Sequence, residues 1–241
     1  MRKLLLIILL APISFFGQES ENTKKVNYKN IDIEVNNSKS EYYYPKLKQR
    51  LIALDSTLTT NDLHYLYYGT SLQKDFSVME RATHDPKMLA YFNQESISQD
   101  QWKDIEKHYT DLFNSKPFLD IETFDILLGV FQNTNQKDKF DKLDNILQKF
   151  FNMWLETGNG LTKETAIDVI STTHEYYFMR VINLKVSGQA LLHDEAGRSY
   201  DLLKVEKEEN SDSKNEEKQI TGVYFDVTRI FELYNETFTK N

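Results

Sequence analysis

The chain has 241 residues, a formal net charge of −8, no cysteine, and 15 phenylalanine and 14 tyrosine residues. Without cysteine, the protein has no disulfide bond, no lipid-carrying N-terminal cysteine and no cysteine nucleophile. An acidic chain without a basic stripe lacks what a phosphate backbone requires, so nucleic acid is excluded as an expected partner. The length allows one domain, or two small layers that share a core.

The first 17 residues have the pattern of a secretory signal peptide. Arg2 and Lys3 supply its positive end. Leu4–Phe16 is the apolar segment, and Gly17 offers a small residue for cleavage. Because a membrane-spanning helix needs about 20 apolar residues, the segment favours cleavage over a permanent anchor. The expected location is periplasmic or secreted, with no membrane span after cleavage. The formal charge then becomes −10, because 27 basic residues remain against 37 acidic ones.

Residues 18–40 are polar, with Glu, Asn, Lys and Ser dominating, and this composition predicts a flexible leader. Ile31, Ile33 and Val35 alternate with polar residues, so a short edge strand is the alternative for this stretch. The folded part of the chain is therefore expected to begin near residue 41.

Two short helices joined by a turn are predicted within Tyr44–Gln73. The first begins at Tyr44-Pro45, because proline suits the first turn of a helix. The second begins where Thr59 and Asp62 have the spacing of a capping box. Its expected buried face repeats at helical spacing and holds Leu63, Leu66, Tyr67 and Thr70.

An aromatic cluster at Tyr65, Tyr67 and Tyr68 lies on the second of these helices. Together with Tyr42–Tyr44, the cluster offers a stacking platform for a sugar or a peptide. Core packing, with the hydroxyl groups at the rim, is the commoner use of such clusters and is the favoured interpretation. Gly69 also lies within this helix, where it is tolerated if a neighbour approaches closely or the helix ends.

Four further helices are predicted from apolar residues at helical spacing. They are a short helix around Met88–Phe92, one over Ser98–Asn114, one over Asp120–Gln132, and a long one that ends at Thr157-Gly158. Successive helix pairs of this size resemble tetratricopeptide hairpins, although the chain has no repeated signature at a period of about 34 residues.

After Gly160 the apolar period changes from helical to alternating, which predicts strands. The expected strands are Thr165–Ser171, Tyr176–Ile182, Gln189–Leu192, Tyr200–Val205 and Ile220–Val227. Thr172–Glu175 is predicted to be a turn, and Gly197 suits a turn position with positive φ. Glu206–Gln219 is a highly charged insertion without a large apolar residue, and residues 228–236 are expected to form a closing helix.

Helices first and strands afterwards predict an α+β fold, in which antiparallel, tetratricopeptide-like helix hairpins pack with a C-terminal antiparallel sheet. The expected organisation is a signal peptide (1–17), a leader (18–40), a helical part (41–157) and a sheet part of the same domain (158–241).

Six short motifs carry a resemblance to a known family. In chain order they are Tyr44-Pro45-Lys46-Leu47, Leu66-Tyr67-Tyr68-Gly69, Thr157-Gly158-Asn159-Gly160, Lys163-Glu164-Thr165-Ala166, Glu175-Tyr176 and Tyr224-Phe225-Asp226. Over residues 41–236 the chain resembles a family of secreted Bacteroidetes proteins catalogued as a domain of unknown function. The resemblance implies export and the architecture above, and it implies no activity. The family's turn commonly reads Ser-Gly-Asp-Gly, whereas this chain has Asn159 in place of the carboxylate.

The motif His174-Glu175 suggests a metal site, but the second histidine that a zincin helix supplies four residues later is missing. The other histidines lack ligand spacing and are expected to have structural or surface roles. They are His64, His84, His108 and His193. The sequence contains no nucleophile elbow and no phosphate-binding glycine loop. It therefore predicts no catalytic residue, no cofactor and no metal.

Gly158-Asn159-Gly160 has two interpretations. Such a turn can present backbone amides to an anion or carbonyl groups to a cation. A helix end that leads into a strand needs the same residues, and this second interpretation is favoured.

Two hypotheses about function, from different classes, follow. The leading one is a non-enzymatic binding or assembly module of a bacterial envelope, with an envelope protein or peptide as its partner. Its candidate interaction surface consists of Tyr65, Tyr67, Tyr68, His174 and Glu175. The alternative is a hydrolase whose acids and histidines converge only in the fold. A deep pocket holding His174 and Glu175 would favour the hydrolase, and an exposed aromatic surface would favour the binding module.

Overall fold

A computed structural model of the chain describes residues 23–81, 85–206 and 220–239. The signal peptide predicted for residues 1–17 lies outside the described residues. Residues 207–219 of the charged insertion also lie outside them.

The described residues form two compact units. The first unit holds Ile31–Thr70 and Glu80–Phe151. The second holds the residues up to Asn30, Ser71–Met79 and the residues from Asn152 onward. The boundary falls inside one long helix, so the division into a helical part (41–157) and a sheet part (158–241) stays a prediction.

Helix α1 (Tyr28–Asn36) corrects the flexible leader predicted for residues 18–40. Ile31 and Val35 are one helical turn apart and both are buried, whereas Ile33 is 58% exposed. The apolar residues that suggested a strand therefore define a helix face. Val35 also explains Gly69, because a Cβ atom at that glycine would lie 2.8 Å from Val35 Cγ1.

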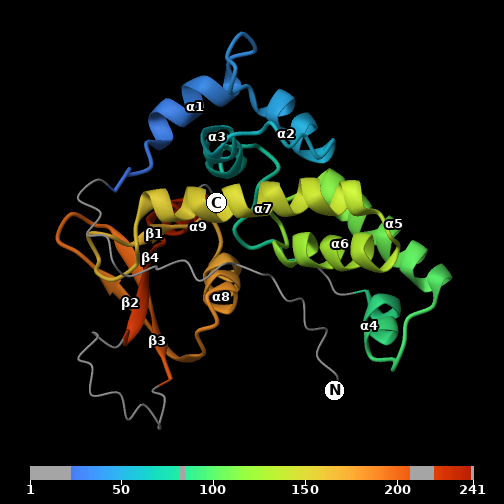
Figure 1. Cartoon of the computed structure of the whole chain (residues 1–241). Helices are drawn as coiled ribbons and strands as arrows, with labels where there is room; N and C mark the ends of the chain where they lie inside the picture. Colours follow the sequence, from blue (N-terminus) through green and yellow to red (C-terminus); the bar gives the residue numbers. More distant parts are fainter. Residues whose placement is uncertain (1–22, 82–84, 207–219, 240–241) are drawn as a thin grey trace. The chain divides into compact units, whose positions relative to one another are not determined.

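The first unit is built from helices, and these confirm the helices predicted after residue 43. They are α2 (Tyr44–Ile52), α3 (Thr60–Thr70), α4 (Pro86–Phe92), α5 (Gln99–Ser115), α6 (Glu122–Asn133) and the larger part of α7 (Lys137–Thr157) (Figure 1). Helices α2 and α3 pack on each other, and so do α5 and α6. A tetratricopeptide-like arrangement of these pairs is not confirmed.

The start of α3 has the predicted capping box. The amide of Asp62 donates a hydrogen bond to Thr59 Oγ1 at 3.0 Å, and the amide of Thr59 donates to Asp62 Oδ2 at 2.9 Å. Each side chain thus satisfies a backbone donor that has no partner inside the helix. Helix α5 begins with the same device, formed by Ser98 and Gln101.

The second unit contains a four-stranded sheet, and its helices and strands together make the fold α+β. The strands are β1 (Ile167–Asp168), β2 (Val186–His193), β3 (Ser199–Val205) and β4 (Gly222–Asp226), in the order β1-β4-β3-β2 (Figure 1). Strand β3 is antiparallel to both β2 and β4, but β1 is parallel to β4. The sheet is therefore mixed, which corrects the antiparallel sheet predicted from the sequence. Gly197, in the turn between β2 and β3, has the expected positive φ of 80°.

Helix α8 (Thr172–Val181) replaces a predicted turn and the predicted strand Tyr176–Ile182. Its sequence is rich in aromatic and β-branched residues, which favour strands locally. Its buried residues nevertheless follow helical spacing, and Phe178 packs against Phe225 of β4 with ring centroids 5.7 Å apart. Packing against the sheet thus overrides the local preference.

One further difference concerns the edge strand β1, and one further prediction is confirmed. Strand β1 has two residues, whereas the sequence predicted a strand over Thr165–Ser171. The closing helix predicted for residues 228–236 is confirmed as α9 (Thr228–Thr239). None of the helices in the described part of the chain combines the length and the apolar character that a membrane span needs.

Candidate functional site

The five residues of the predicted interaction surface divide between the two units. Tyr65, Tyr67 and Tyr68 belong to α3, and His174 and Glu175 belong to α8. Only Tyr65 is partly exposed, and the other four side chains are fully buried. The structure therefore leaves Tyr65 as the surface residue of this set and places the other four in the interior.

Tyr67 and Tyr68 belong to an aromatic core in the first unit. The ring of Tyr67 lies edge-on to those of Phe118 and Phe150, with centroids 5.4 and 5.1 Å apart. Tyr68 lies 4.8 Å from Tyr67 and 4.8 Å from the ring of His64. Edge-to-face contacts of this kind add to the free energy of burial. Core packing, the favoured interpretation of the cluster, is correct for these two tyrosines.

Tyr65 forms a stacked pair with Tyr42, which precedes α2. The ring centroids are 4.0 Å apart and the ring planes differ by 10°. Both side chains are partly exposed. The side-chain amide of Asn61 donates a hydrogen bond to the hydroxyl oxygen of Tyr42 at 2.8 Å, which holds the Tyr42 ring in place. Burial, and then the nearby carboxylate of Glu41, raise the pKa of Tyr42, so this hydroxyl stays protonated at neutral pH.

The sequence indicated both members of this pair without pairing them. Tyr42 and Tyr65 came from two aromatic clusters that were each considered as a platform. Tyr42 lies just before α2 and Tyr65 lies on α3. The two segments come together because α2 and α3 form a hairpin, which the sequence did predict. Which tyrosine of each cluster turns outward depends on the rotation of each helix against the core.

His174 and Glu175 lie in the first turn of α8, where Ser171 caps the helix. His174 packs near the indole of Trp154, with ring centroids 6.1 Å apart. The sequence placed this motif at the start of a strand, and the helix turns both side chains into the interior of the second unit.

Glu175 and Asp201 of β3 form a buried carboxyl pair, and neither carboxyl oxygen of Glu175 has a hydrogen-bond partner. Burial and the charge of Asp201 raise the pKa of Glu175 well above its ordinary value. Burial also raises the pKa of Asp201, while the hydrogen bond from Gln189 opposes that rise. Two buried carboxyl groups this close do not both ionise readily, so the raised pKa favours the protonated form of Glu175.

A chain of hydrogen bonds leads from this carboxyl pair to the exposed side chain of Tyr176. The amide nitrogen of Gln189 donates to Asp201 Oδ2 at 2.6 Å, and the hydroxyl of Tyr176 donates to Gln189 Oε1 at 2.9 Å. Sequence reasoning missed Asp201 and Gln189. Both lie on strands whose position relative to α8 is set only by packing. Because Glu175 is fully buried, its carboxyl group does not reach a substrate in this structure.

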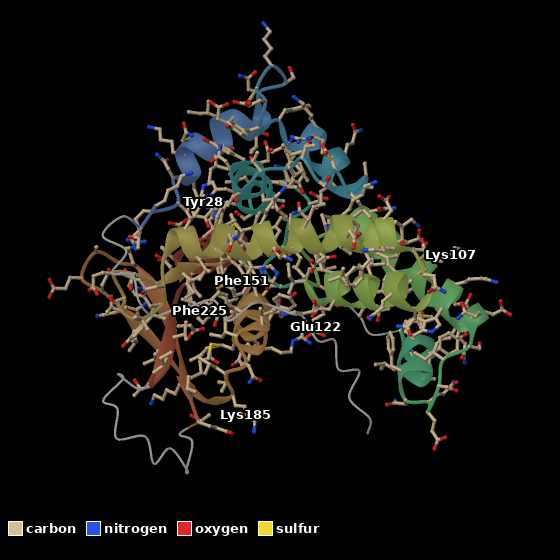
Figure 2. The ribbon with its side chains drawn as sticks, in the orientation of Figure 1. Tyr28, Lys107, Glu122, Phe151, Lys185 and Phe225 are labelled. Atoms are coloured by element: carbon tan, nitrogen blue, oxygen red, sulfur yellow. The ribbon has the colours of Figure 1, made fainter. Side chains whose placement is uncertain are left out.

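A second group of charges lies where β1 and β4 end. Their parallel register places Asp168 beside Asp226. Arg198 forms an ion pair with Asp226, and the hydroxyl of Tyr28, labelled in Figure 2, donates to Asp168 Oδ1 at 2.8 Å. Burial, and then the charge of Asp226, raise the pKa of Asp168 well above its ordinary value, while Tyr28, Arg198 and Lys25 oppose this. The hydrogen bond from Tyr28 ties the beginning of α1 to the sheet.

This second group was not found from the sequence, because its members are far apart in the chain. It contains two carboxyl groups together with Arg198 and Lys25, a composition that suits an internal ion cluster better than a cation site. Among the described residues, no group of three or more His, Asp or Glu side chains has the arrangement of a metal site. His84 lies outside those residues.

The turn Gly158-Asn159-Gly160 connects α7 to the sheet. The amide of Gly160 donates to the carbonyl oxygen of Thr165 at 2.7 Å, and its own carbonyl oxygen accepts from the amide of Tyr224 at 2.8 Å. A Cβ atom at Gly158 would lie 2.1 Å from the same Thr165 oxygen. These contacts support the interpretation as a helix end that leads into a strand, with backbone groups already engaged.

Comparison with known proteins agrees with the resemblance seen in the motifs. A family model described as "Domain of unknown function (DUF4919)" matches residues 29–236. A search of curated proteins found no match. A search of solved structures also found none.

Proposed function

We propose that this chain, which belongs to the DUF4919 family of unknown function, is a non-enzymatic binding module of a bacterial envelope, periplasmic or secreted. Its partner is an envelope protein or peptide. The observation that carries the proposal is the Tyr42–Tyr65 stack, an ordered and partly exposed aromatic surface on the first unit.

The physical argument for the stack is that the Tyr42 and Tyr65 side chains are already ordered in the free protein. Tyrosine supplies a large contact area with few rotatable bonds, and its hydroxyl keeps hydrogen-bonding capacity at the rim. In this protein the rings already hold each other at 4.0 Å, and Asn61 holds the hydroxyl of Tyr42. Side chains that are ordered in the free protein lose less entropy on association, so more of the contact energy appears as affinity.

The proposed location follows from the N-terminal pattern. Arg2 and Lys3 followed by the apolar segment Leu4–Phe16 favour export. Exported proteins are often stabilised by disulfide bonds, which this chain cannot form. Export is still compatible with its sequence, because a helical unit with an aromatic core supplies its own stability. Intact-mass measurement of the protein from its host is expected to give a mature N-terminus near Gln18. Retention of Met1 on membrane-bound protein would contradict cleavage.

The test removes the aromatic surface and keeps the bulk of the side chains. The double variant Tyr42→Leu/Tyr65→Leu is used as bait against the host envelope fraction, beside the wild type. Tyr91→Leu is the matched control, because Tyr91 is a partly exposed tyrosine of the same unit on α4. Partners recovered reproducibly with the wild type and the control are purified and titrated against all three proteins.

We expect the double variant to lose the partner, with a fall in affinity of at least tenfold, while the control binds as the wild type does. Melting curves check that the first unit stays folded. Equal affinity of the double variant and the wild type would refute the stack as the binding surface. Turnover of a substrate in a broad hydrolase screen, with no reproducible partner, would refute the binding module.

The alternative function, a hydrolase, requires acids that meet a substrate. Glu175 and Asp201 form a carboxyl pair in the second unit, and His174 precedes Glu175 on α8, yet the side chains of His174 and Glu175 are fully buried. This arrangement favours a structural carboxyl pair, and the binding module remains the better supported proposal.

A further inference from the structure

Strand β2 lies at an edge of the sheet. Among the described residues it pairs with β3 and with no other strand (Figure 1). An edge strand presents backbone N–H and C=O groups that can pair with another extended chain. The opposite edge is β1, which has two residues, whereas β2 has eight. Strand β2 is therefore the edge with enough length for strand addition.

The sequence of β2 lacks the side chains that usually protect an edge. Natural edge strands carry lysine, proline or inward-pointing charges, or they are bent by a bulge. Val186–His193 contains no lysine, arginine, aspartate, glutamate or proline. Its register with β3 shifts between Val186 and Gly188, so a bulge bends only the beginning of the strand. The regular part, Gly188–His193, carries Leu191 with 46% of its surface exposed.

Charges flank this neutral strand with opposite signs at its two ends. Lys185, labelled in Figure 2, precedes β2, and Asp194 and Glu195 follow it. If two copies of β2 pair in antiparallel fashion, the end that carries Lys185 lies beside the partner's end that carries Asp194 and Glu195. Parallel pairing would instead bring like charges together. The edge is thus complementary to a second copy of itself in one direction.

The side-chain period restricts the register of such a pair. Two antiparallel copies are related by a two-fold axis perpendicular to the sheet, so residues opposite each other lie on the same face. A register centred on Leu191 meets this condition. It places Leu191 opposite the partner's Leu191 and Gln189 opposite the partner's His193, and it uses residues 189–193 of the strand. The exposed leucine then finds an apolar neighbour.

We propose that β2 is a self-association edge, through which two copies of this chain join their sheets by antiparallel β2–β2 pairing centred on Leu191. The inference concerns the second unit and does not depend on the Tyr42–Tyr65 stack. Because a single edge contact is small compared with a standard protein interface, the dimer forms with micromolar affinity and depends on protein concentration.

The first experiment measures molecular mass by analytical ultracentrifugation from low to high micromolar concentration, on the protein in the form that its host accumulates. The wild type is expected to change from monomer to dimer over this range. Leu191→Lys places two like charges opposite each other and should weaken dimerisation at least about tenfold. Leu161→Lys is the matched control, because Leu161 is 41% exposed in the same unit and lies outside β2. It should dimerise as the wild type does.

A charge exchange tests the direction of pairing. Lys185→Glu and Glu195→Lys should each weaken the dimer, and the double variant should restore it, because antiparallel pairing places these two oppositely charged ends beside each other. Hydrogen exchange at the amides of Gly188–Leu192 should slow as the wild-type concentration rises. A wild type that stays monomeric throughout the range would overturn the proposal, including the case in which the edge binds only a foreign peptide. Equal weakening by Leu161→Lys, or no rescue by the double variant, would overturn it as well.

Discussion

Helices α3 and α8 are the most completely buried short helices of their units, and they bury different chemistry. Helix α3 turns Leu63, Leu66 and Tyr67 into an interior of aromatic rings. Helix α8 buries Phe178 against the sheet but also brings Glu175 against Asp201. Both helices begin with a hydroxyl side chain at the cap, so the difference lies in what they bury and not in how they start.

The two helices differ in how the free energy of burying their side chains depends on pH. Burial of an apolar or aromatic side chain is favourable at any pH. Burial of a carboxyl group is tolerated when the group is neutral, so Glu175 requires a proton. The stabilisation from Leu63, Leu66 and Tyr67 on α3 is therefore expected to be independent of pH, whereas the second unit should lose stability when Glu175 ionises.

The largest expected effect is on α3. Leu66 is fully buried, and Leu66→Ala would leave a cavity that costs about 2–5 kcal/mol of unfolding free energy. Leu89→Ala on α4, where the side chain is 45% exposed, should cost well under about 1 kcal/mol. Thermal and denaturant unfolding of both variants measure the contrast. A Leu66→Ala protein as stable as the wild type would remove α3 from the core.

The next effect concerns the turn that connects α7 to the sheet in the second unit. Gly158→Ala would place Cβ 2.1 Å from the carbonyl oxygen of Thr165, a backbone atom that cannot move alone. We expect a loss of about 2–3 kcal/mol. Gly197→Ala is the control, because its added Cβ meets nothing within 4 Å and only its positive φ is unfavourable, at about 1 kcal/mol. Equal losses in denaturant unfolding would contradict the close approach.

The third effect is the dependence of stability on pH. The pKa of Glu175 is raised in the folded state, so the folded protein binds more protons than the unfolded chain above the ordinary carboxyl pKa. Stability therefore falls as pH rises from about 4.3 to the raised pKa, by at most about 1.4 kcal/mol per pH unit for one proton.

Glu175→Gln isolates this contribution, since burial also raises the pKa of Asp168 and Asp201 in the same direction. The variant keeps the shape of the side chain and a hydrogen-bond donor toward Asp201. Its unfolding free energy, measured from pH 5 to pH 9, should fall less steeply than that of the wild type. Parallel curves for the two proteins would show that Glu175 does not hold the proton.

The smallest effects are at the two caps. Thr59→Ala removes the hydrogen bond to the Asp62 amide at 3.0 Å and disrupts a reciprocal pair, with an expected cost of about 1 kcal/mol. Ser171→Ala removes a hydrogen bond to the Thr173 amide that is 3.4 Å long, so about 0.5 kcal/mol is expected. A larger loss for Ser171→Ala in denaturant unfolding would show that the start of α8 depends on its cap more than the geometry indicates.

Features set by neighbours in the chain were predictable. The spacing of Thr59 and Asp62 gave the start of α3. Gly197 gave a turn with positive φ. In each case a side chain acts on backbone groups within a few residues, so the sequence contains the whole interaction.

Features that depend on distant partners were not predictable. Residues 172–181 were assigned to a turn and a strand because aromatic and β-branched residues favour strands, and packing of Phe178 on Phe225 makes them a helix. In the candidate site, Tyr65 was indicated by its cluster, but its stacking on Tyr42 and the burial of Tyr67 and Tyr68 depend on how α2 and α3 rotate against the core. The family match over residues 29–236 confirms the resemblance to a domain of unknown function, and export stays a prediction.

The sequence by itself determined the helices α2 to α7, the strands β2, β3 and β4 and the α+β class, because periodicity and capping are local properties of the chain. Only the tertiary structure decided the parallel pairing of β1 with β4, the helical state of α8, and the buried pairing of Glu175 with Asp201 that raises the pKa of Glu175. Each of these joins residues far apart in sequence. Their energies come from burial and pairing, which exist only when the segments have met.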